Sequence, residues 1–315
     1  MIVFRHWCWS FLGVVIESIP FIVMGAIIST IIQFYITEEV IRRIVPKRKV
    51  LAFLAAAFMG LVFPMCECAI VPVSRSLIKK GVPVGIAITF MLSVPIVNPF
   101  VIASTYYAFD ANLTIVIIRV LGGIFCSIIV GTIISYIFMN TPIENIISDG
   151  YLDLSCACCS SEKKYYTSKL DKLHTIVCQA SNEFLNISVY VILGALISSI
   201  FGSVIKEEIL NDYTFNNVLA IVIMIGISFL LSLCSEADAF VASKFLKNFG
   251  IPSVSAFMVL GPMMDLKNSI LTLGLFKKKF ATTLIITILL VVTAFSICLS
   301  FINVILRICA GKFRD

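Results

Sequence analysis

Long apolar runs alternate with short polar stretches along the 315-residue chain. An uncharged apolar run of about 18 or more residues is long enough to cross a bilayer as a helix. Five runs contain no charged residue and a sixth contains only Arg119; in chain order the six are residues 18–37, 81–109, 113–138, 184–205, 213–235 and 280–306. The pattern predicts an all-α polytopic membrane protein.

Composition supports this prediction. Hydrophobic residues make up 60% of the chain and charged residues 13%, and the mean hydropathy is +1.06, whereas a soluble domain carries about 25% charged residues. The net charge of +6 gathers in loops, where it reports on membrane topology. We therefore expect a lipid bilayer, and no nucleic acid, among the partners. The apolar N-terminal stretch that leads into the first run contains Glu17, and further runs follow it, so we do not interpret it as a cleaved signal peptide.

An internal repeat divides the chain. A constant offset of 169 residues places Glu67 on Glu236, Gly-Ala-Ile-Ile-Ser (25–29) on Gly-Ala-Leu-Ile-Ser (194–198), and Gly-Val-Pro (81–83) on Gly-Ile-Pro (250–252). One offset shared by separate blocks indicates a duplicated unit. We predict a first membrane repeat at 1–140 and a second at 175–315, joined by a polar linker at 141–174.

Loop charges predict how the two repeats are oriented. Residues 42–49 of the first repeat include five basic residues, whereas their counterpart at 206–212 is net acidic. Opposite charge in equivalent loops is expected of inverted repeats. Inversion requires an odd number of crossings per repeat, so residues 50–80 must leave and return on one side. We predict about eight long transmembrane helices plus two re-entrant or short-helix hairpins, with the linker in the cytoplasm.

Prolines interrupt corresponding helices of the two repeats. Pro95 and Pro99 fall within the run 81–109, and Pro262 occupies the matching region of the second repeat. Proline breaks the helical hydrogen-bond ladder, and paired breaks are the best sequence indicator of a transporter's binding site. Three polar residues beside the breaks could bind a solute or cap the broken helix ends: Asn98, Asp265 and Asn268.

Two thiols flank a carboxylate at Cys66-Glu67-Cys68, between two prolines and two apolar runs. Polar groups at membrane depth mark a functional site by default, and thiolates favour soft ions such as Cu(I), Zn or metalloids. On one helix the thiols would lie about 200° apart, so their convergence requires an unwound hairpin tip. The alternative is two buried, inert cysteines beside a loop glutamate.

The second repeat carries Cys234, Glu236 and Asp238 at the corresponding position. Acids after a long uncharged run are either hydrated in a cavity or protonated, and proton coupling is a natural use for them. Alternatively, this tip simply reaches the aqueous face. Glu17, directly before the run 18–37, is a further candidate for coupling or gating. The alternative is that it is an interfacial residue.

The linker contains three closely spaced cysteines, Cys156, Cys158 and Cys159. In a reducing cytoplasm such thiols could bind a metal, although three ligands alone make an incomplete zinc site. A cysteine-bearing linker without function is the alternative.

The blocks 66–83, 94–99 and 234–242, which read CECAIVPVSRSLIKKGVP, VPIVNP and CSEADAFVA, resemble the bacterial predicted permeases of the YraQ/ArsP type. The resemblance extends over nearly the whole chain. It implies an integral inner-membrane permease, and some members of the family export trivalent organoarsenicals. In the family pattern the two cysteines usually enclose serine and precede glycine; here Glu67 and Ala69 stand in those places.

These observations favour an ion-coupled efflux transporter for a small, soft, thiol-reactive solute, such as a trivalent organoarsenical, a metalloid or a heavy metal, in the bacterial inner membrane. The thiols of Cys66, Cys68 and Cys234 would hold the solute, and the neighbouring acids would carry protons or tune the thiols. We predict no cofactor, and the chain has no G-x-x-x-x-G-K-[ST] motif for an ATP-driven motor. Two alternatives are a membrane thiol–disulfide oxidoreductase, which would be an enzyme, and a membrane partner that presents a metal-binding linker.

Overall fold

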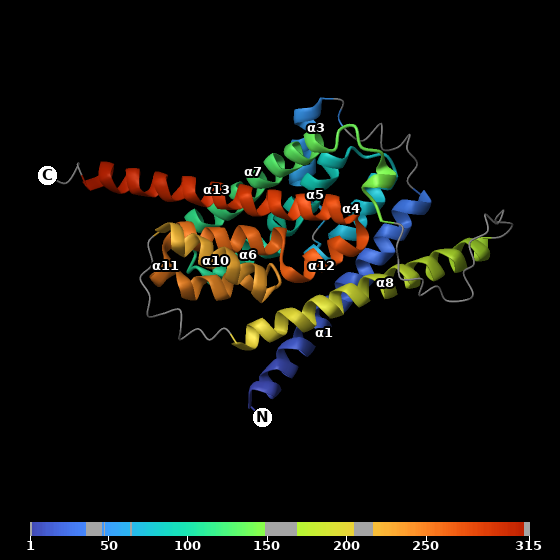
Figure 1. Cartoon of the computed structure of the whole chain (residues 1–315), viewed down its shortest axis with the longest axis horizontal. Coiled ribbons are helices and arrows are strands. Elements are labelled where there is room, and N and C mark those ends of the chain that lie inside the picture. Colours follow the sequence, from blue (N-terminus) through green and yellow to red (C-terminus); the bar gives the residue numbers. More distant parts are fainter. Residues whose placement is uncertain are drawn as a thin grey trace.

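The computed structural model describes residues 2–35, 46, 48–63, 65–148, 169–204 and 217–311. The first half contains α1 (Ile2–Tyr35), α3 (Lys49–Phe58) with the short 3-10 helix η1 (Met59–Leu61), α4 (Glu67–Lys79), α5 (Val84–Val97), α6 (Pro99–Ala108), α7 (Leu113–Ile137) and η2 (Ile143–Asn145). The second half contains α8 (Lys169–Val204), α10 (Asn217–Leu231), α11 (Asp238–Met263), α12 (Leu266–Leu275) and α13 (Lys278–Gly311). Figure 1 shows these helices as one bundle in which α1 and α8 lie side by side.

The two halves present their helices in the same order. Gly250 has a φ of +73° inside α11, so α11 is two helices that meet at this residue. Gly81, its partner in the sequence repeat, also has a positive φ of +91° between α4 and α5. Glycine adopts this left-handed region without steric cost. Each half therefore runs through a long helix, a short helix, an irregular break, a short helix, a turn at glycine, a further helix, a short helix and a final long helix.

The number of helices long and apolar enough to cross a membrane is smaller than the eight expected. Among the described residues five helices meet the requirement, or six if α5 and α6, which are bent by 42°, count as one span. The helices 49–61 and 218–231 are short, because the apolar runs that contain them are cut by the breaks before Glu67 and Asp238. The fold is thus helical and polytopic, and the count of eight is not confirmed.

The helix breaks lie close to the prolines but not on all of them. Pro95 and Pro262 lie inside the last turns of α5 and α11, which continue to Val97 and Met263. Pro99 is the first residue of α6, and Asn98 before it has left the helical region with ψ 129°. A residue that precedes proline is disfavoured in the α region, so the first break falls at Asn98. The breaks therefore fall within the proline-bearing stretches, at Asn98 and at Met264–Asp265, a few residues after Pro95 and Pro262.

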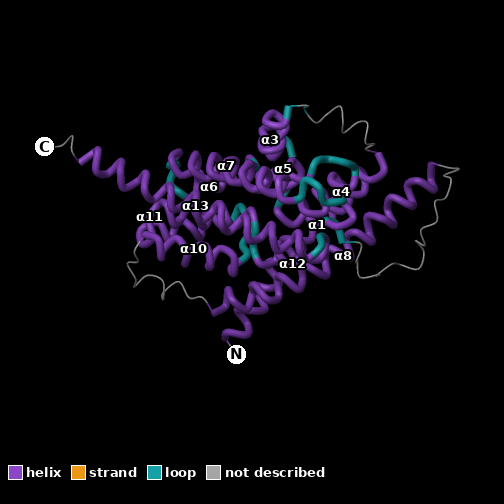
Figure 2. The backbone as a smooth tube through the Cα atoms, turned by 45° about the horizontal axis from the view of Figure 1, so that its top comes forward, coloured by secondary structure: helices purple, strands orange, loops and turns teal. Residues whose placement is uncertain are grey.

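Two glycines bring the long first helices close to the helices that carry the polar centre. A Cβ on Gly25 of α1 would lie 2.8 Å from the Cα of Ala69 on α4, and a Cβ on Gly194 of α8 would lie 2.6 Å from the Cα of Lys267 on α12. Small residues permit this close helix packing in membranes. Figure 2 shows α1, α4, α8 and α12 gathered at one side of the bundle. The glycines match in sequence, yet they contact helices that do not correspond.

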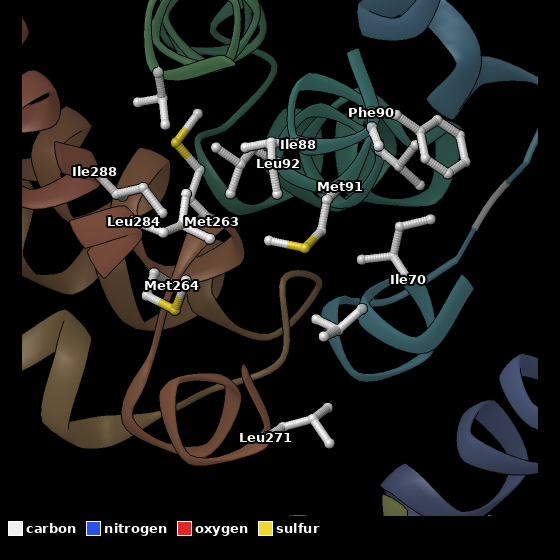
Figure 3. Packing of buried hydrophobic residues seen from close by; sticks show 14 of the residues in the cluster. Ile70, Ile88, Phe90, Met91, Leu92, Met263, Met264, Leu271, Leu284 and Ile288 are labelled. Carbon is white, nitrogen blue, oxygen red and sulfur yellow. The ribbon is translucent and has the colours of Figure 1, made fainter. Parts of the chain in front are cut away.

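The apolar core is shared by both halves. Side chains from α4, α5, the end of α11, α12 and α13 point toward one another in Figure 3, among them Ile70, Met91, Met263, Leu271 and Leu284. All are at most 2% exposed. Close packing of this kind holds the breaks of the two halves at a fixed separation.

The start of the linker is fixed to the second half. The Ser148 amide donates to the Leu275 carbonyl at 3.2 Å, and the Lys277 amide donates to the Ile146 carbonyl at 2.9 Å. Arg75 on α4 donates to the Ser148 carbonyl at 2.8 Å and is only 2% exposed. Residues 146–148 therefore connect α4 to the α12–α13 junction.

Candidate functional site

The first tip, residues 65–68, brings the two predicted thiols together. Cys66 has an extended backbone (φ −80°, ψ 169°) and precedes α4, whereas Glu67 and Cys68 form its first turn. The thiols of Cys66 and Cys68 lie within electrostatic range of each other, although they would point in opposite directions on a regular helix. Cys68 is 2% exposed and Cys66 is half-buried. The expected unwinding lies before Glu67, where Met65 and Cys66 are both outside helices.

Glu67 connects the first tip to the second half. Its Oε2 accepts a hydrogen bond of 2.9 Å from the Ser235 hydroxyl, and its Oε1 lies 3.4 Å from the Lys267 Nζ. The carboxylate is 1% exposed and the lysine 0%. The second tip, residues 232–238, thus lies directly against the first tip.

Asp265 organises the break before α12. Its Oδ1 accepts from the Asn268 amide at 2.6 Å, and its Oδ2 accepts from the Ser232 hydroxyl at 2.5 Å. The same Oδ2 lies 3.8 Å from the Lys267 Nζ. Asp265 therefore caps α12 and holds the second tip against it, while Lys267 stands between Glu67 and Asp265.

Asp238 is paired with a cation from the first half. The Arg119 Nη2 lies 2.8 and 2.9 Å from the two Asp238 carboxylate oxygens and 2.9 Å from the Ser235 carbonyl oxygen. The Arg119 Nη1 donates to the Thr105 hydroxyl at 2.7 Å. Arg119 is 1% and Asp238 1% exposed. Several hydrogen bonds on each member are what allows a buried ion pair to compensate its loss of hydration.

The two ion pairs are reciprocal. Glu67 of the first half pairs with Lys267 of the second, and Asp238 of the second half pairs with Arg119 of the first. Each half thereby supplies the cation that neutralises the other half's buried acid. Removing one member of such a pair costs about 3–5 kcal/mol, because the other charge stays buried.

The remaining predicted groups of the second tip are less buried than this centre. Cys234 and Glu236 are half-buried, and Cys234 lies within electrostatic range of Lys267, Glu67 and Cys68. Glu17 is within range of both Cys234 and Glu236.

Glu17 is exposed on α1 and does not point to the bundle interior. Successive residues of a helix point about 100° apart. Here the inward position belongs to Ser18, which is 2% exposed and donates to the Val14 carbonyl.

The two asparagines differ in role. The Asn98 Oδ1 accepts from the Phe100 amide at 3.0 Å and so caps α6, in agreement with the capping alternative. Asn268 is 2% exposed, and its Oδ1 has no hydrogen-bond partner within the described ranges. Asn268 therefore retains an acceptor at the polar centre.

No group of three or more His, Cys, Asp or Glu side chains in the described part of the chain is arranged to hold a metal ion. Cys156, Cys158 and Cys159, the predicted metal ligands of the linker, lie outside the described residues.

Sequence reasoning missed Arg119, Lys267, Ser232 and Ser235 as members of the site. A single charge within a long apolar run was the available signal for Arg119, because buried cations in membrane spans pair with acids. Arg75 of α4 is buried as well, against the start of the linker.

Comparison with known proteins agrees with this architecture. Residues 4–301 match the ArsP_1 family, described as predicted permease. The UPF0718 protein YcgR of Bacillus subtilis is 39% identical over 287 residues, which cover 91% of this chain and 94% of that protein. A putative two-component membrane permease complex subunit of Streptococcus mutans is 35% identical over 270 residues, covering 86% of this chain and 87% of that protein. No solved structure matches the chain.

Proposed function

The chain belongs to the ArsP_1 family of predicted permeases, and from this premise we propose that it is a secondary transporter that exports a soft, thiol-reactive solute such as a trivalent organoarsenical, a metalloid or a heavy metal. Its apolar helices make it a multi-pass membrane protein, and its bacterial relatives indicate the plasma membrane. The relatives also favour a transporter over an enzyme.

The observation that carries the proposal is that the tips bearing Cys66, Cys68 and Cys234 lie against each other, with the Ser235 hydroxyl 2.9 Å from the Glu67 carboxylate. Cys68 of the first tip lies within electrostatic range of Cys66 and of Cys234 in the second tip. Lys267 lies within electrostatic range of both Cys68 and Cys234. A trivalent arsenical would be held by exchange with these thiols: each As–S bond that forms replaces an As–OH bond, and the displaced hydroxide leaves as water with the thiol proton.

We propose that the acids carry the compensating protons. Glu236 is half-buried beside this centre, and the ion pairs of Glu67 and Asp238 join the halves. A proton on either buried acid would remove one side of a pair and loosen the contact between the halves. Such a change would permit the rocking of one repeat against the other on which alternating access depends.

We propose that residues 1–140 and 175–315 are inverted repeats and that 141–174 is a cytoplasmic linker. The common order of helices and the positive φ of both Gly81 and Gly250 support a duplicated unit. Opposite charges of equivalent loops support the inversion. Labelling of single cysteines placed in the loop after α6 and in the loop after α12, from each side of the membrane, tests it: inverted repeats place the two on opposite sides.

The transport proposal is tested by growth of an arsenical-sensitive host that expresses the wild type, Cys66→Ser, Cys68→Ser or the control Cys298→Ser, whose thiol is exposed on α13. We expect the wild type and the control to confer resistance to trivalent organoarsenicals. Both tip variants should lose it at equal membrane abundance. Full resistance in the tip variants would exclude the thiol mechanism, and a wild type without resistance would exclude this solute class.

A second subunit is a further part of the proposal, because the relative from Streptococcus mutans is named as a subunit of a two-component membrane permease complex. We expect the purified chain alone to transport less in proteoliposomes than the chain co-purified with its partner. Equal rates would show that the chain works without one.

A further inference from the structure

A second polar group lies at the other end of α4, outside the thiol centre. The Ser29 and Ser76 hydroxyls are 2.7 Å apart, and Ser29 Oγ donates to Glu183 Oε1 at 3.4 Å. Gln33 Nε2 donates to Ser76 at 3.0 Å, and Gln179 Nε2 donates to Gln33 Oε1 at 2.7 Å. Ser29 and Gln33 belong to α1, Ser76 to α4, and the other two residues to α8, so three helices from both halves meet here.

Glu183 is buried and lies within a candidate membrane span. It is 7% exposed, and Ser29 and Ser76 are 0% and 1% exposed. The candidate spans are Trp7–Tyr35 and Thr175–Ile200. With a rise of 1.5 Å per residue, Ser29 lies about 9 Å and Glu183 about 12 Å inside the ends of these spans. An acid at such depth is costly and marks a functional site by default.

The hydrogen bonds suit a group that gains and loses a proton. An ionised carboxylate only accepts, and Ser29 donates to it. A protonated carboxyl can donate instead, and either serine hydroxyl can be the donor of the Ser29–Ser76 bond. Binding of one proton can therefore make Glu183 the donor to Ser29 and Ser29 the donor to Ser76.

We propose that Glu183 is a proton-binding site of the permease, positioned by Ser29 and Ser76, that couples proton binding to the contacts of α1 with α8 and α4. Coupling to solute movement rests on the proposed function. Ser76 lies nine residues beyond Glu67 on α4, about 14 Å along the helix. A change at Glu183 thus acts on the helix that carries Glu67 and Cys68 at its start.

Other charged and titratable groups at this end come from the same three helices. They are Arg75 and Lys79 on α4, Tyr35 on α1 and Cys178 on α8. Arg75 also donates to the Ser148 carbonyl, so this end of α4 is joined to the start of the linker.

Infrared difference spectroscopy between acidic and alkaline buffer tests the site on the reconstituted full chain without any solute. We expect a pH-dependent carboxyl C=O band in the wild type and in the control Glu144→Gln, whose side chain is exposed in η2. Glu183→Gln should lose one such band. Ser29→Ala should keep it at a shifted frequency, because the carboxyl loses a hydrogen-bond partner, and this second variant retains the acid if Glu183→Gln folds poorly. Spectra of Glu183→Gln and Ser29→Ala identical to the wild type would overturn the proposal.

Everted membrane vesicles test the coupling. We expect uptake of methylarsenite by the wild type to rise several-fold with an imposed pH gradient, whereas uptake by Glu183→Gln should not respond to the gradient. An unchanged gradient response in Glu183→Gln would overturn the coupling role. If the wild type moves no arsenical at all, the proposed function fails, while the infrared titration still decides whether Glu183 binds the proton.

Discussion

The first tip, residues 65–68, and the second tip, residues 232–238, bury their acids in different ways. In the first tip Glu67, the first residue of α4, is the buried acid. In the second tip Glu236, its partner in the sequence repeat, lies in the break before α11 and is half-buried. Asp238, two residues later, takes the buried position and the ion pair.

This difference shows that equivalent positions of a duplicated sequence need not have equivalent chemistry. Lys267 belongs to α12 and Arg119 to α7, helices that do not correspond in the repeat. The two halves share one arrangement: each has a buried acid at its tip, and a cation from the other half neutralises that acid. Glu236 is not the acid of this ion pair. It is half-buried and lies within electrostatic range of Glu17.

The strongest test of the comparison removes the cation of the first tip. Lys267→Met leaves both Glu67 and Asp265 buried without a counter-charge, so we expect a loss of about 3–5 kcal/mol of stability. Thermal unfolding of the purified protein in detergent measures it. Lys279→Met, an exposed lysine at the start of α13, is the matched control, and Glu67→Gln added to Lys267→Met should recover part of the loss. Equal melting of the two lysine variants would contradict the assigned pairing.

The second test separates the two acids of the second tip. Asp238→Asn leaves Arg119 buried without its counter-charge, and we expect a cost of about 3 kcal/mol. Glu236→Gln should cost less than about 1 kcal/mol, because a half-exposed acid is partly hydrated. The comparison is made by thermal unfolding of the two variants side by side. A larger loss for Glu236→Gln would reverse the roles given to these acids.

The third test concerns the glycines that seat the tips. Gly25→Val should force α1 away from Ala69, and Gly194→Val should force α8 away from Lys267, each at a cost of about 1–3 kcal/mol. Gly13→Val is the control, because nothing lies within 4 Å of its added Cβ. Melting temperatures are again the measurement. If all three variants melt together, the close contacts do not hold the tips.

The smallest expected effect is a difference in thiol access. Cys66 and Cys234 are half-buried, whereas Cys68 and Cys126 are buried. Brief treatment of the native protein with N-ethylmaleimide, followed by peptide mass spectrometry, should modify the first two before the others, because alkylation requires access to the sulfur. Detergent denaturation should remove the difference. Early modification of Cys68 would show that the first tip is more open than its geometry indicates.

Much of the fold was predictable from local pattern. The apolar runs predicted a helical membrane protein, and most of α1, α7, α8 and α13 lies within them or overlaps them. Helix ends were less accurate, since α1 begins at Ile2 and the helix expected to continue to residue 235 ends at Leu231. Prolines indicated the regions of the breaks, but the break fell at Asn98 because proline acts on the residue before it.

Spacing and charge along the chain determined that the cysteines and acids of the two tips are the unusual groups in an apolar background, and that the chain has two similar halves. Which acid is buried, which cation neutralises it and which thiols meet were decided only by tertiary structure. Lys267 is 200 residues from Glu67 in the chain, and Arg119 is 119 residues from Asp238. Pairs so distant leave no periodic signal, because the requirement to neutralise a buried charge is met by whichever helix the packing brings within reach.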